Sequence, residues 1–338
     1  MDLNEKFELI KRNTEETVQD DELKDILKKK IPSAYIGYAP TGKLHVGHIF
    51  PIIKIGDFLK AGFNVKFLIA DLHAFLDDMK SPWELLKLRA EYYKETVKAL
   101  LESLNIKTEK LEFVRGSDFQ LDKKYQMDLL HLMGEVTLKR ARRAAAEVVR
   151  FKDDPKLGGY VYPLMQVLDP VYLKADVCFS GIDQRGIYML GREILPKLNY
   201  NKPTCVFTPL LPGLKGGKMS ASDTGSKIGL LDSEKEVDEK INRSYCKAGE
   251  TKDNGILLFV KNVLFMVNDE FIVKRDKKFG GDLIYKDYAE LEKDFKNHKL
   301  HPLDLKKAVS KEINDIIKPV RKRLENKKDL VKKAYPDK

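Results

Sequence analysis

Five short apolar runs alternate with helical patterns along the first 210 residues of the chain. Each run has the length of a buried strand, and together they cover residues 34–38, 65–70, 111–115, 176–180 and 204–208. Runs of this kind that alternate with helices are typical of a parallel sheet covered on both faces. The pattern therefore predicts an α/β fold with a doubly wound, Rossmann-like sheet, whose ligands bind at the carboxyl ends of the strands.

The first two helices of this pattern carry their own start and stop signals. One helix is predicted over residues 45–60 and ends before Gly62, since glycine suits the left-handed turn that follows a helix. The next is predicted to begin at Ser81 as its N-cap, with Pro82 in the first helical position and Glu84 completing a capping box. Both helices fit the connections that a doubly wound sheet requires.

Two later stretches depart from simple alternation. Residues 118–150 are mainly helical in pattern, which predicts a helical insertion over about residues 120–155, between two halves of the sheet. Residues 162–169 then form a helix that Pro170 is expected to end, because proline lacks the N–H that the next turn would use.

A change of pattern after the last strand marks a domain boundary. Residues 213–226 form a glycine-rich loop, after which Ser233 and Glu236 make a capping box at the start of a helix. A chain of 338 residues is long enough for two domains. We expect a catalytic domain over residues 1–228 and a mostly α-helical domain over residues 229–338.

The composition is that of a globular enzyme, with 43% hydrophobic and 34% charged residues. No apolar run has membrane-spanning length, and the polar N-terminus lacks a signal-peptide core. The three cysteines are widely spaced, which argues against a disulfide framework or a metal knuckle, so we expect a cytoplasmic protein without a metal site. Lysine and arginine number 62 against 52 aspartate and glutamate, and this net charge of +10 is compatible with a polyanionic partner.

Two separated segments carry the chemistry of an ATP site. Residues 45–48 (HVGH) stand at the start of the first predicted helix, and residues 218–222 (KMSAS) lie in the glycine-rich loop. His45 and His48 are three residues apart, so they share a face beside unpaired backbone N–H groups that favour anions. Gly47 between them allows a nucleotide to approach closely.

Each segment also has a simpler interpretation. A histidine pair at this spacing can be a helix cap or a surface feature, and Lys218 can be a solvated residue of a basic loop. Residues 35–43 favour the ATP site, because they supply the strand and turn that a phosphate site requires, and a mobile lysine can close on pyrophosphate in the transition state. The two segments in this order are similar to the signature pair of class I aminoacyl-tRNA synthetases.

A polar pocket is predicted on the helix before Pro170. Tyr162, Gln166 and Asp169 are spaced i, i+4 and i+7, which places them on one face of that helix. Asp169 lies in the last turn, where the helix dipole disfavours a negative charge, so another group is expected to hold it. The alternative is a hydrogen-bonded face in contact with solvent.

Over nearly its whole length the chain resembles the tyrosyl-tRNA synthetases of the archaeal and eukaryotic type. The resemblance rests on six ordered segments, at residues 34–48, 70–75, 116–120, 162–166, 181–185 and 218–222. It implies a ligase that activates L-tyrosine with ATP and transfers it to tRNA(Tyr), and that works as a homodimer. The alternatives are a tryptophan–tRNA ligase, a small nucleotidyltransferase of the same superfamily, and a noncatalytic synthetase-like RNA-binding protein.

The resemblance also implies how tyrosine is bound. Tyr35 and Asp169 would bind the phenolic hydroxyl, since a phenol needs a donor and an acceptor. The α-ammonium group would be held by Tyr162, Gln166 and Gln184. The ring would be lined by Leu68, His73 and Phe119.

For ATP, the matching positions are Gly37, Thr41, His45, Gly47, His48, Gly181, Asp183 and Lys218, with Asp183 on the ribose. The catalytic positions are His45, His48, Lys218, Ser220 and Ser222. Mg²⁺ is expected to arrive with ATP, without a dedicated protein ligand.

For tRNA, the resemblance assigns acceptor-stem contacts to a basic cluster in the insertion and anticodon contacts to the C-terminal domain. The candidates are Lys139, Arg140, Arg143, Arg185, Phe279, His301 and Asp304. The cluster can also be a solvated face, and Phe279 can be a core aromatic beside a turn. Ala39 and Gly186 depart from the family pattern, where an acidic residue and a lysine are common; this leaves the ATP loop and the acceptor-stem contacts open.

Overall fold

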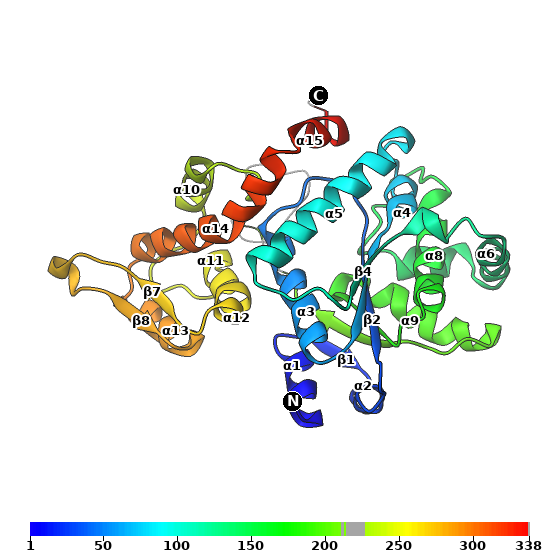
Figure 1. Ribbon diagram of the computed structural model, residues 1–338, viewed down its shortest axis with the longest axis horizontal. Coiled ribbons are helices and arrows are strands. Elements are labelled where there is room, and N and C mark those ends of the chain that lie inside the picture. Colours follow the sequence, from blue (N-terminus) through cyan, green and yellow to red (C-terminus); the bar gives the residue numbers. More distant parts are fainter. Residues whose placement is uncertain (211–212, 214–226, 337–338) are drawn as a thin grey trace.

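Six strands form one sheet in the order β1-β6-β5-β2-β3-β4 (Figure 1). The computed structural model describes residues 1–210, 213 and 227–336. Neighbouring strands are parallel except at the edge, where β1 pairs antiparallel with β6. The strands are β1 (Glu16–Val18), β2 (Ser33–Tyr38), β3 (Asn64–Ile69), β4 (Leu111–Arg115), β5 (Val177–Gly181) and β6 (Thr204–Thr208). The doubly wound sheet predicted from the apolar runs is confirmed.

The order of the strands places the ligand crevice. From β2 the chain moves outward to β3 and β4, and it then returns to β5 on the other side of β2. The topological switch therefore lies between β2 and β5, and ligands of such sheets bind outside the carboxyl ends of the strands at that point. The segments that leave these two ends begin at residues 39 and 182.

Alternating side chains of the strands face two different cores. One core contains Ile36, Phe67 and Phe179 and includes residues of α3, α5 and the C-terminal helices. The opposite face carries Tyr35 and Leu68, which pack with residues of α9 and β6. The candidate tyrosine pocket therefore lies on the second face of the sheet.

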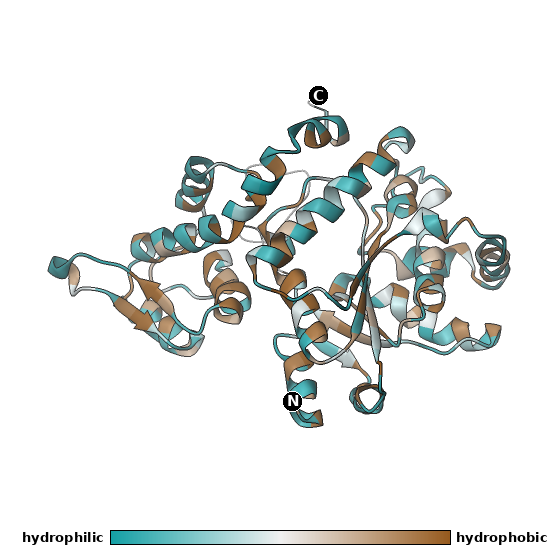
Figure 2. Ribbon diagram, viewed as in Figure 1, coloured by the Kyte–Doolittle hydropathy of each residue, from teal (hydrophilic) through white to brown (hydrophobic). Residues whose placement is uncertain are grey.

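Helices cover both faces of the sheet and form most of the C-terminal part (Figure 1). In the first part they are α1 (Leu3–Lys11), α2 (Asp20–Leu27), α3 (Ile49–Lys60), α4 (Asp71–Leu76), α5 (Leu86–Ser103), α6 (Lys123–Glu135), α7 (Leu138–Ala144), α8 (Gly158–Tyr172) and α9 (Arg185–Ile194). In the second they are α10 (Glu234–Arg243), α11 (Gly255–Phe259), α12 (Phe265–Val267), α13 (Tyr288–Lys296), α14 (Pro302–Glu325) and α15 (Lys328–Ala334). Figure 2 shows that hydrophilic and hydrophobic residues alternate along helices such as α5 and α14.

Short helical turns and a small sheet complete the fold. The single turns are η1 (Val46–His48), η2 (Trp83–Leu85), η3 (Gly116–Asp118), η4 (Ile182–Gln184), η5 (Leu195–Leu198) and η7 (Lys277–Phe279), and η6 (Val260–Leu264) is a π-helical turn. The C-terminal part also contains a two-stranded antiparallel sheet of β7 (Phe271–Val273) and β8 (Leu283–Tyr285). None of the helices within the described ranges is long and apolar enough to cross a membrane.

The predicted start of the second helix is wrong. Pro82 is the N-cap of η2, and α5 follows from Leu86, without a side-chain cap from Ser81. The N–H of Ser81 instead donates to the carbonyl of Ala74 (3.0 Å), which turns the residue toward the preceding helix. By contrast, the capping box of Ser233 and Glu236 forms as predicted at the start of α10.

The predicted end of the next helix at Pro170 is also wrong, because α8 continues to Tyr172 with Pro163 and Pro170 inside it. Each proline removes one helical hydrogen bond, and its ring crowds the carbonyl four residues back, at a cost of about 3 kcal/mol or more. All residues from 162 to 170 are buried, and this packing offsets the two missing bonds. The bonds resume at once, since the N–H of Leu173 donates to the carbonyl of Asp169 (2.9 Å).

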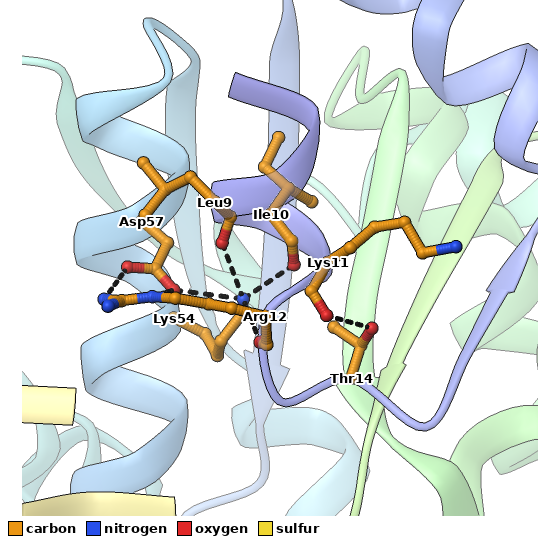
Figure 3. Close-up of polar contacts among 7 residues, drawn as sticks. All are labelled: Leu9, Ile10, Lys11, Arg12, Thr14, Lys54 and Asp57. Atoms are coloured by element: carbon orange, nitrogen blue, oxygen red, sulfur yellow. Dashed lines mark hydrogen bonds and ion pairs between the residues drawn. The ribbon is translucent and has the colours of Figure 1, made fainter. Parts of the chain in front are cut away.

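A buried lysine joins the N-terminal helix to α3, the helix that follows the HVGH segment (Figure 3). The Lys54 ammonium donates to the carbonyls of Ile10 (2.7 Å) and Arg12 (3.1 Å) at the end of α1. It also pairs with the buried Asp57 carboxylate (3.0 Å), which the Arg12 guanidinium contacts from outside. A cation there satisfies carbonyls that the end of a helix leaves unpaired.

We predict that Asp57→Ala lowers the free energy of unfolding by about 3–5 kcal/mol, because it leaves the Lys54 ammonium buried without its counter-ion. Chemical denaturation measures the change. Asp25→Ala is the matched control, since Asp25 pairs with Lys28 on the exposed surface. A loss no larger than that of the control would show that the buried cluster does not stabilise the fold.

Candidate active site

The floor of the pocket is formed by the carboxylate of Asp169, which is only 1% exposed. Gln120 Nε2 donates to its Oδ1 (2.7 Å), and the Tyr125 hydroxyl donates to the same oxygen (3.0 Å). Burial raises the pKa of Asp169 to about 7, while these two donors oppose the rise. The sequence indicated that some group must hold a carboxylate in the last turn of this helix, and Gln120 and Tyr125 are the groups that do so.

A second buried carboxylate fixes the turn that presents Gln120. Asp71 accepts hydrogen bonds from the backbone N–H (2.9 Å) and the hydroxyl (2.6 Å) of Ser117 in η3. The N–H of Gln120 in turn donates to the carbonyl of Gly116 (2.9 Å). A Cβ on Gly116 would lie 2.5 Å from Gln120 Oε1 and 3.0 Å from Asp71 Oδ1, so this turn needs glycine.

Next to this floor, Tyr35 on β2 and Tyr188 on α9 share a hydrogen bond between their hydroxyls (2.8 Å). Burial raises the pKa of both phenols, so both hydroxyls keep their protons at neutral pH. Two hydroxyls that share one hydrogen bond have a second O–H hydrogen between them, and this O–H can donate to a ligand oxygen.

The residues predicted to line the ring lie around the same centre. Leu68 is buried beside Gly37 on the neighbouring strand, and Phe119 packs edge-on against Tyr125 with ring centroids 5.7 Å apart. His73 Nε2 lies 3.7 Å from Asp169 Oδ2. Within the described chain, both ring nitrogens of His73 are buried without a hydrogen-bond partner. Unpaired polar atoms in a buried site fit a ligand that carries its own polar groups.

The polar face of α8 extends from Asp169 toward the carboxyl end of β5. Tyr162 packs edge-on against His73, with ring centroids 4.7 Å apart, and Gln166 Nε2 donates to Gln184 Oε1 (3.0 Å). Gln184 belongs to η4, directly after β5. The structure thus brings together Tyr162, Gln166 and Gln184, and the solvent-facing alternative for this helix face is wrong because residues 162–170 are buried.

The two histidines of the HVGH segment lie at the other strand end. His45 is the N-cap of η1, and its Nδ1 accepts a hydrogen bond from the N–H of Gly47 (3.2 Å). Burial lowers the pKa of His45 to about 2 and that of His48 to about 4, so both rings are neutral near pH 7. Because Nδ1 of His45 is an acceptor, the proton of the neutral ring is on Nε2, which is a donor for an anionic ligand.

The remaining predicted ATP residues surround the same strand ends. Gly37 is exposed at the end of β2, and Thr41 lies in the following turn. Gly181 ends β5, and its Cβ would lie 2.7 Å from Asp183 Oδ1. Lys218, Ser220 and Ser222 lie outside the described residues. No group of three or more His, Cys, Asp and Glu in the described ranges could hold a metal ion.

The predicted acceptor-stem cations differ in their surroundings. Lys139 and Arg143 are exposed on α7, while Arg140 pairs with Glu193 and Arg185 makes a two-point ion pair with Glu16 on β1. The departure at position 186 has a structural reason. A Cβ there would lie 2.5 Å from the carbonyl oxygen of residue 144 at the end of α7, so close packing of α7 on α9 requires Gly186.

The C-terminal candidates lie on two connected segments. Phe279 is 61% exposed and is followed by Gly280 at φ 94° and Gly281 at φ 76°, so the core-aromatic alternative is wrong. His301 caps α14, with its Nδ1 accepting from the N–H of residue 303 (3.2 Å). Arg275 connects the two segments, because its guanidinium donates to the carbonyls of Gly281 (2.9 Å) and residue 299 (3.1 Å). Asp304 lies in the first turn of the same helix.

Three residues of the pocket were not identified from the sequence: Gln120, Tyr125 and Tyr188. Gln120 lies in a segment that carried the family resemblance, which was the available signal. Tyr125 and Tyr188 come from helices whose patterns show only that they face a core. A half-buried, neutral histidine pair at the switch point of a doubly wound sheet is the arrangement of class I aminoacyl-tRNA synthetases, and the fold and the site define this class.

Comparisons with known proteins extend this assignment. The model of the family "tRNA synthetases class I (W and Y)" matches residues 27–318. A tyrosine–tRNA ligase of Haloarcula marismortui is 50% identical over 100% of this chain and 99% of its own. A crystal structure of the tyrosyl-tRNA synthetase from Archaeoglobus fulgidus, complexed with L-tyrosine, matches with a TM-score of 0.90 and 44% sequence identity. The match covers 96% of this chain and 100% of the other chain. The crystal structure of the tyrosyl-tRNA synthetase from Pyrococcus horikoshii, also with L-tyrosine, has a TM-score of 0.93 at 29% identity, over 99% of each chain. The chain belongs to the class I tRNA synthetases for W and Y and, within them, to the tyrosyl-tRNA synthetases.

We predict that Asp169 titrates near pH 7 in the folded protein and that Tyr125→Phe raises its pKa further by removing a donor to the charged form. Carboxyl-detected NMR measures both titrations. The folded pKa lies above the value of about 3.9 for an unfolded aspartate. The protonated form therefore favours folding, and this contribution is lost as pH rises from about 4 through about 7. Titration near pH 4 would contradict the prediction.

Proposed function

We propose that the chain is a tyrosine–tRNA ligase, which forms tyrosyl-adenylate from L-tyrosine and ATP and then transfers the tyrosyl group to the 3′ end of tRNA(Tyr). The observation that carries the proposal is the buried Asp169 carboxylate, which lies on the same face of the sheet as Tyr35. The chain that contains it belongs to the tyrosyl-tRNA synthetases. Two solved relatives are described as complexes with L-tyrosine.

In the proposed pocket the phenol of tyrosine donates to Asp169 and accepts from Tyr35. The ring lies against Leu68, His73 and Phe119, and the α-ammonium group binds Tyr162, Gln166 and Gln184. The tryptophan alternative fits this floor less well, because an indole N–H can donate to the carboxylate but offers no oxygen to the Tyr35 hydroxyl. A buried polar group left unpaired in this way disfavours the wrong amino acid.

Activation on this site requires positioning and electrostatic stabilisation, without a protein nucleophile. An oxygen of the tyrosine carboxylate attacks the α-phosphorus of ATP, and the bond to the bridging oxygen breaks as pyrophosphate leaves. His45 Nε2–H and the His48 ring face the phosphates, where donors stabilise the charge that develops in the transition state. Lys218, Ser220 and Ser222 are proposed to act on the pyrophosphate. Mg²⁺ is proposed to enter on the phosphates of ATP, where it would neutralise charge.

The remaining ATP contacts are proposed at the two strand ends. Gly37, Thr41 and Gly47 would allow the phosphates to approach the backbone, and Gly181 and Asp183 would contact the ribose side. Close approach to backbone N–H groups at a helix start favours an anionic ligand.

The tRNA contacts are proposed on two surfaces. Lys139, Arg140, Arg143 and Arg185 would bind the acceptor stem, for which the exposed cations of α7 offer phosphate contacts. The exposed ring of Phe279 is suited to stack on an unpaired base, and His301 and Asp304 would read its edge. The ion pair between Arg185 and Glu16 must open or rearrange for Arg185 to take part.

We also propose a homodimer in the reducing cytoplasm. Helix α6 and its flanks expose an apolar set made up of Leu121, Met127, Leu130, Met133 and Leu138. Several large apolar side chains exposed on and beside one helix are typical of a protein interface, and a two-fold dimer would pair the same residues on both copies. The three cysteines are unpaired thiols, as a reducing compartment permits.

The proposed activity predicts tyrosine-dependent exchange of pyrophosphate into ATP and no exchange with tryptophan. Asp169→Ala should abolish the preference for tyrosine over phenylalanine. Tyrosyl-tRNA synthetases are themselves the standard example of this discrimination, and its size of about 10⁵ is the value known for that family. Asp128→Ala is the control, because Asp128 also accepts bonds from tyrosine hydroxyls but lies outside the pocket. Unchanged discrimination in Asp169→Ala would remove this residue from the pocket.

For the ATP side, His45→Ala should lower the exchange rate by about 10²–10³, the usual cost of losing one preorganised donor. The KM for tyrosine should change little, because the ring is assigned no contact with the amino acid. The midpoint of thermal unfolding should fall only slightly, because the variant loses the single cap that Nδ1 gives to the N–H of Gly47. Steady-state exchange kinetics and calorimetry measure these quantities. A near-normal rate in a folded variant would show that His45 does not act on ATP.

A further inference from the structure

The far end of the chain packs on the turn at the ATP side of the site. Tyr335 follows α15, and its hydroxyl donates to the carbonyl oxygens of Gly42 (3.0 Å) and Pro40 (3.4 Å). These carbonyls belong to the turn of residues 40–42, which connects β2 to the HVGH segment. A residue nearly 300 positions away in the sequence therefore contacts the loop that the proposed function assigns to the phosphates.

Tyr335 is itself held by two residues of α5. The guanidinium of Arg89 lies over its ring, 4.5 Å from the centroid, and the ring of Tyr92 packs edge-on at 5.2 Å. Arg89 Nε also donates to the carbonyl of Ala334 (3.0 Å), whose side chain is fully buried. Ala334 and Tyr335 are thus packed and hydrogen-bonded parts of the fold.

All three carbonyls of the turn are bonded from this side. Besides the two bonds from Tyr335, the Tyr93 hydroxyl donates to the carbonyl of Gly42 (2.8 Å), and Arg89 donates to that of Thr41 (3.4 Å). In a trans peptide the C=O and the next N–H point in opposite directions. Carbonyls held toward α5 therefore direct the N–H groups of Gly42 and Lys43 the other way, and consecutive N–H groups with a common direction bind anions.

The same C-terminal helices reach the HVGH segment by a second route. Arg321 on α14 donates to the carbonyl of Asp232 (2.8 Å), and the Asp232 carboxylate accepts from the N–H of Gly229 (2.8 Å). Gly229 forms a β-bridge with His45, and the N–H of Val46 donates to the carbonyl of residue 228 (2.9 Å). Residues 40–46 are therefore held at both ends by hydrogen bonds that begin in the C-terminal part of the chain.

We propose that Tyr335 is a positioning residue of the ATP site: its hydroxyl holds the turn of residues 40–42 so that the N–H groups of Gly42 and Lys43 face the phosphates of ATP. The inference rests on the proposed function for the identity of the nucleotide reaction. It assigns a role in ATP binding to a residue that follows the last helix of the C-terminal part.

The test is Tyr335→Phe, which removes the hydroxyl and keeps the ring against Arg89 and Tyr92. The KM for ATP in tyrosine-dependent exchange should rise about three- to tenfold, as expected for the loss of hydrogen bonds to two carbonyls. The KM for tyrosine and the unfolding midpoint should stay at wild-type values. The matched control is Tyr288→Phe, which removes a hydroxyl bond to Glu292 (2.9 Å) elsewhere in the C-terminal part.

An unchanged KM for ATP in Tyr335→Phe would overturn the inference. An equal rise in the KM of both substrates would do the same, because it would show a general loss of structure. Calorimetric titration with ATP alone separates this result from a failure of the proposed function. If the wild type binds ATP but shows no exchange with tyrosine, the proposed function fails, and the ratio of ATP dissociation constants between the wild type and Tyr335→Phe still decides the inference.

Discussion

A carboxylate in an apolar interior must be held by hydrogen bonds or take up a proton, and the pocket of this chain is built around such a group. Asp169 is buried on α8, and its oxygen accepts from Gln120 and Tyr125, which belong to different segments. Gln120 depends on the turn that Asp71 fixes. Removal of any one of these groups takes a hydrogen bond from another buried polar atom, which is costly at low dielectric. The pKa of this carboxyl group is about 7. At neutral pH and above, the ionised carboxylate can therefore accept a hydrogen bond from a phenol.

The two halves of the proposed reaction meet because of the sheet topology. The switch between β2 and β5 opens a crevice at their carboxyl ends, with the histidines after β2 and Gln184 after β5. The amino acid pocket lies on one face of the sheet and the HVGH helix start at its edge. On the other side, the C-terminal helices brace the ATP turn through Tyr335 and the histidine segment through Arg321. The segment proposed to bind the nucleotide is therefore in contact with residues from the C-terminal part of the chain.

Much of this architecture could be predicted from the sequence, since continuous apolar runs identify buried parallel strands. The edge strand β1 was missed, because three residues without an apolar run give no periodic signal. The helix through Pro170 was cut short because tertiary packing outweighed a local rule. In the pocket, the i, i+4, i+7 spacing in the sequence predicts the polar face of α8. Tyr125 and Tyr188 reach the pocket only through long-range packing, which has no local sequence signal. The contact of Tyr335 with Gly42 has no sequence signal at all, since nothing local relates the two residues.

The central claim is that the phenol of tyrosine binds at the floor made by Asp169 and Tyr35. A crystal structure of this protein with L-tyrosine tests it most directly. We expect the phenolic oxygen within hydrogen-bond distance of both residues and the α-ammonium group beside Gln166 and Gln184. A tyrosine bound in the opposite direction, or one whose hydroxyl contacts neither residue, would contradict it.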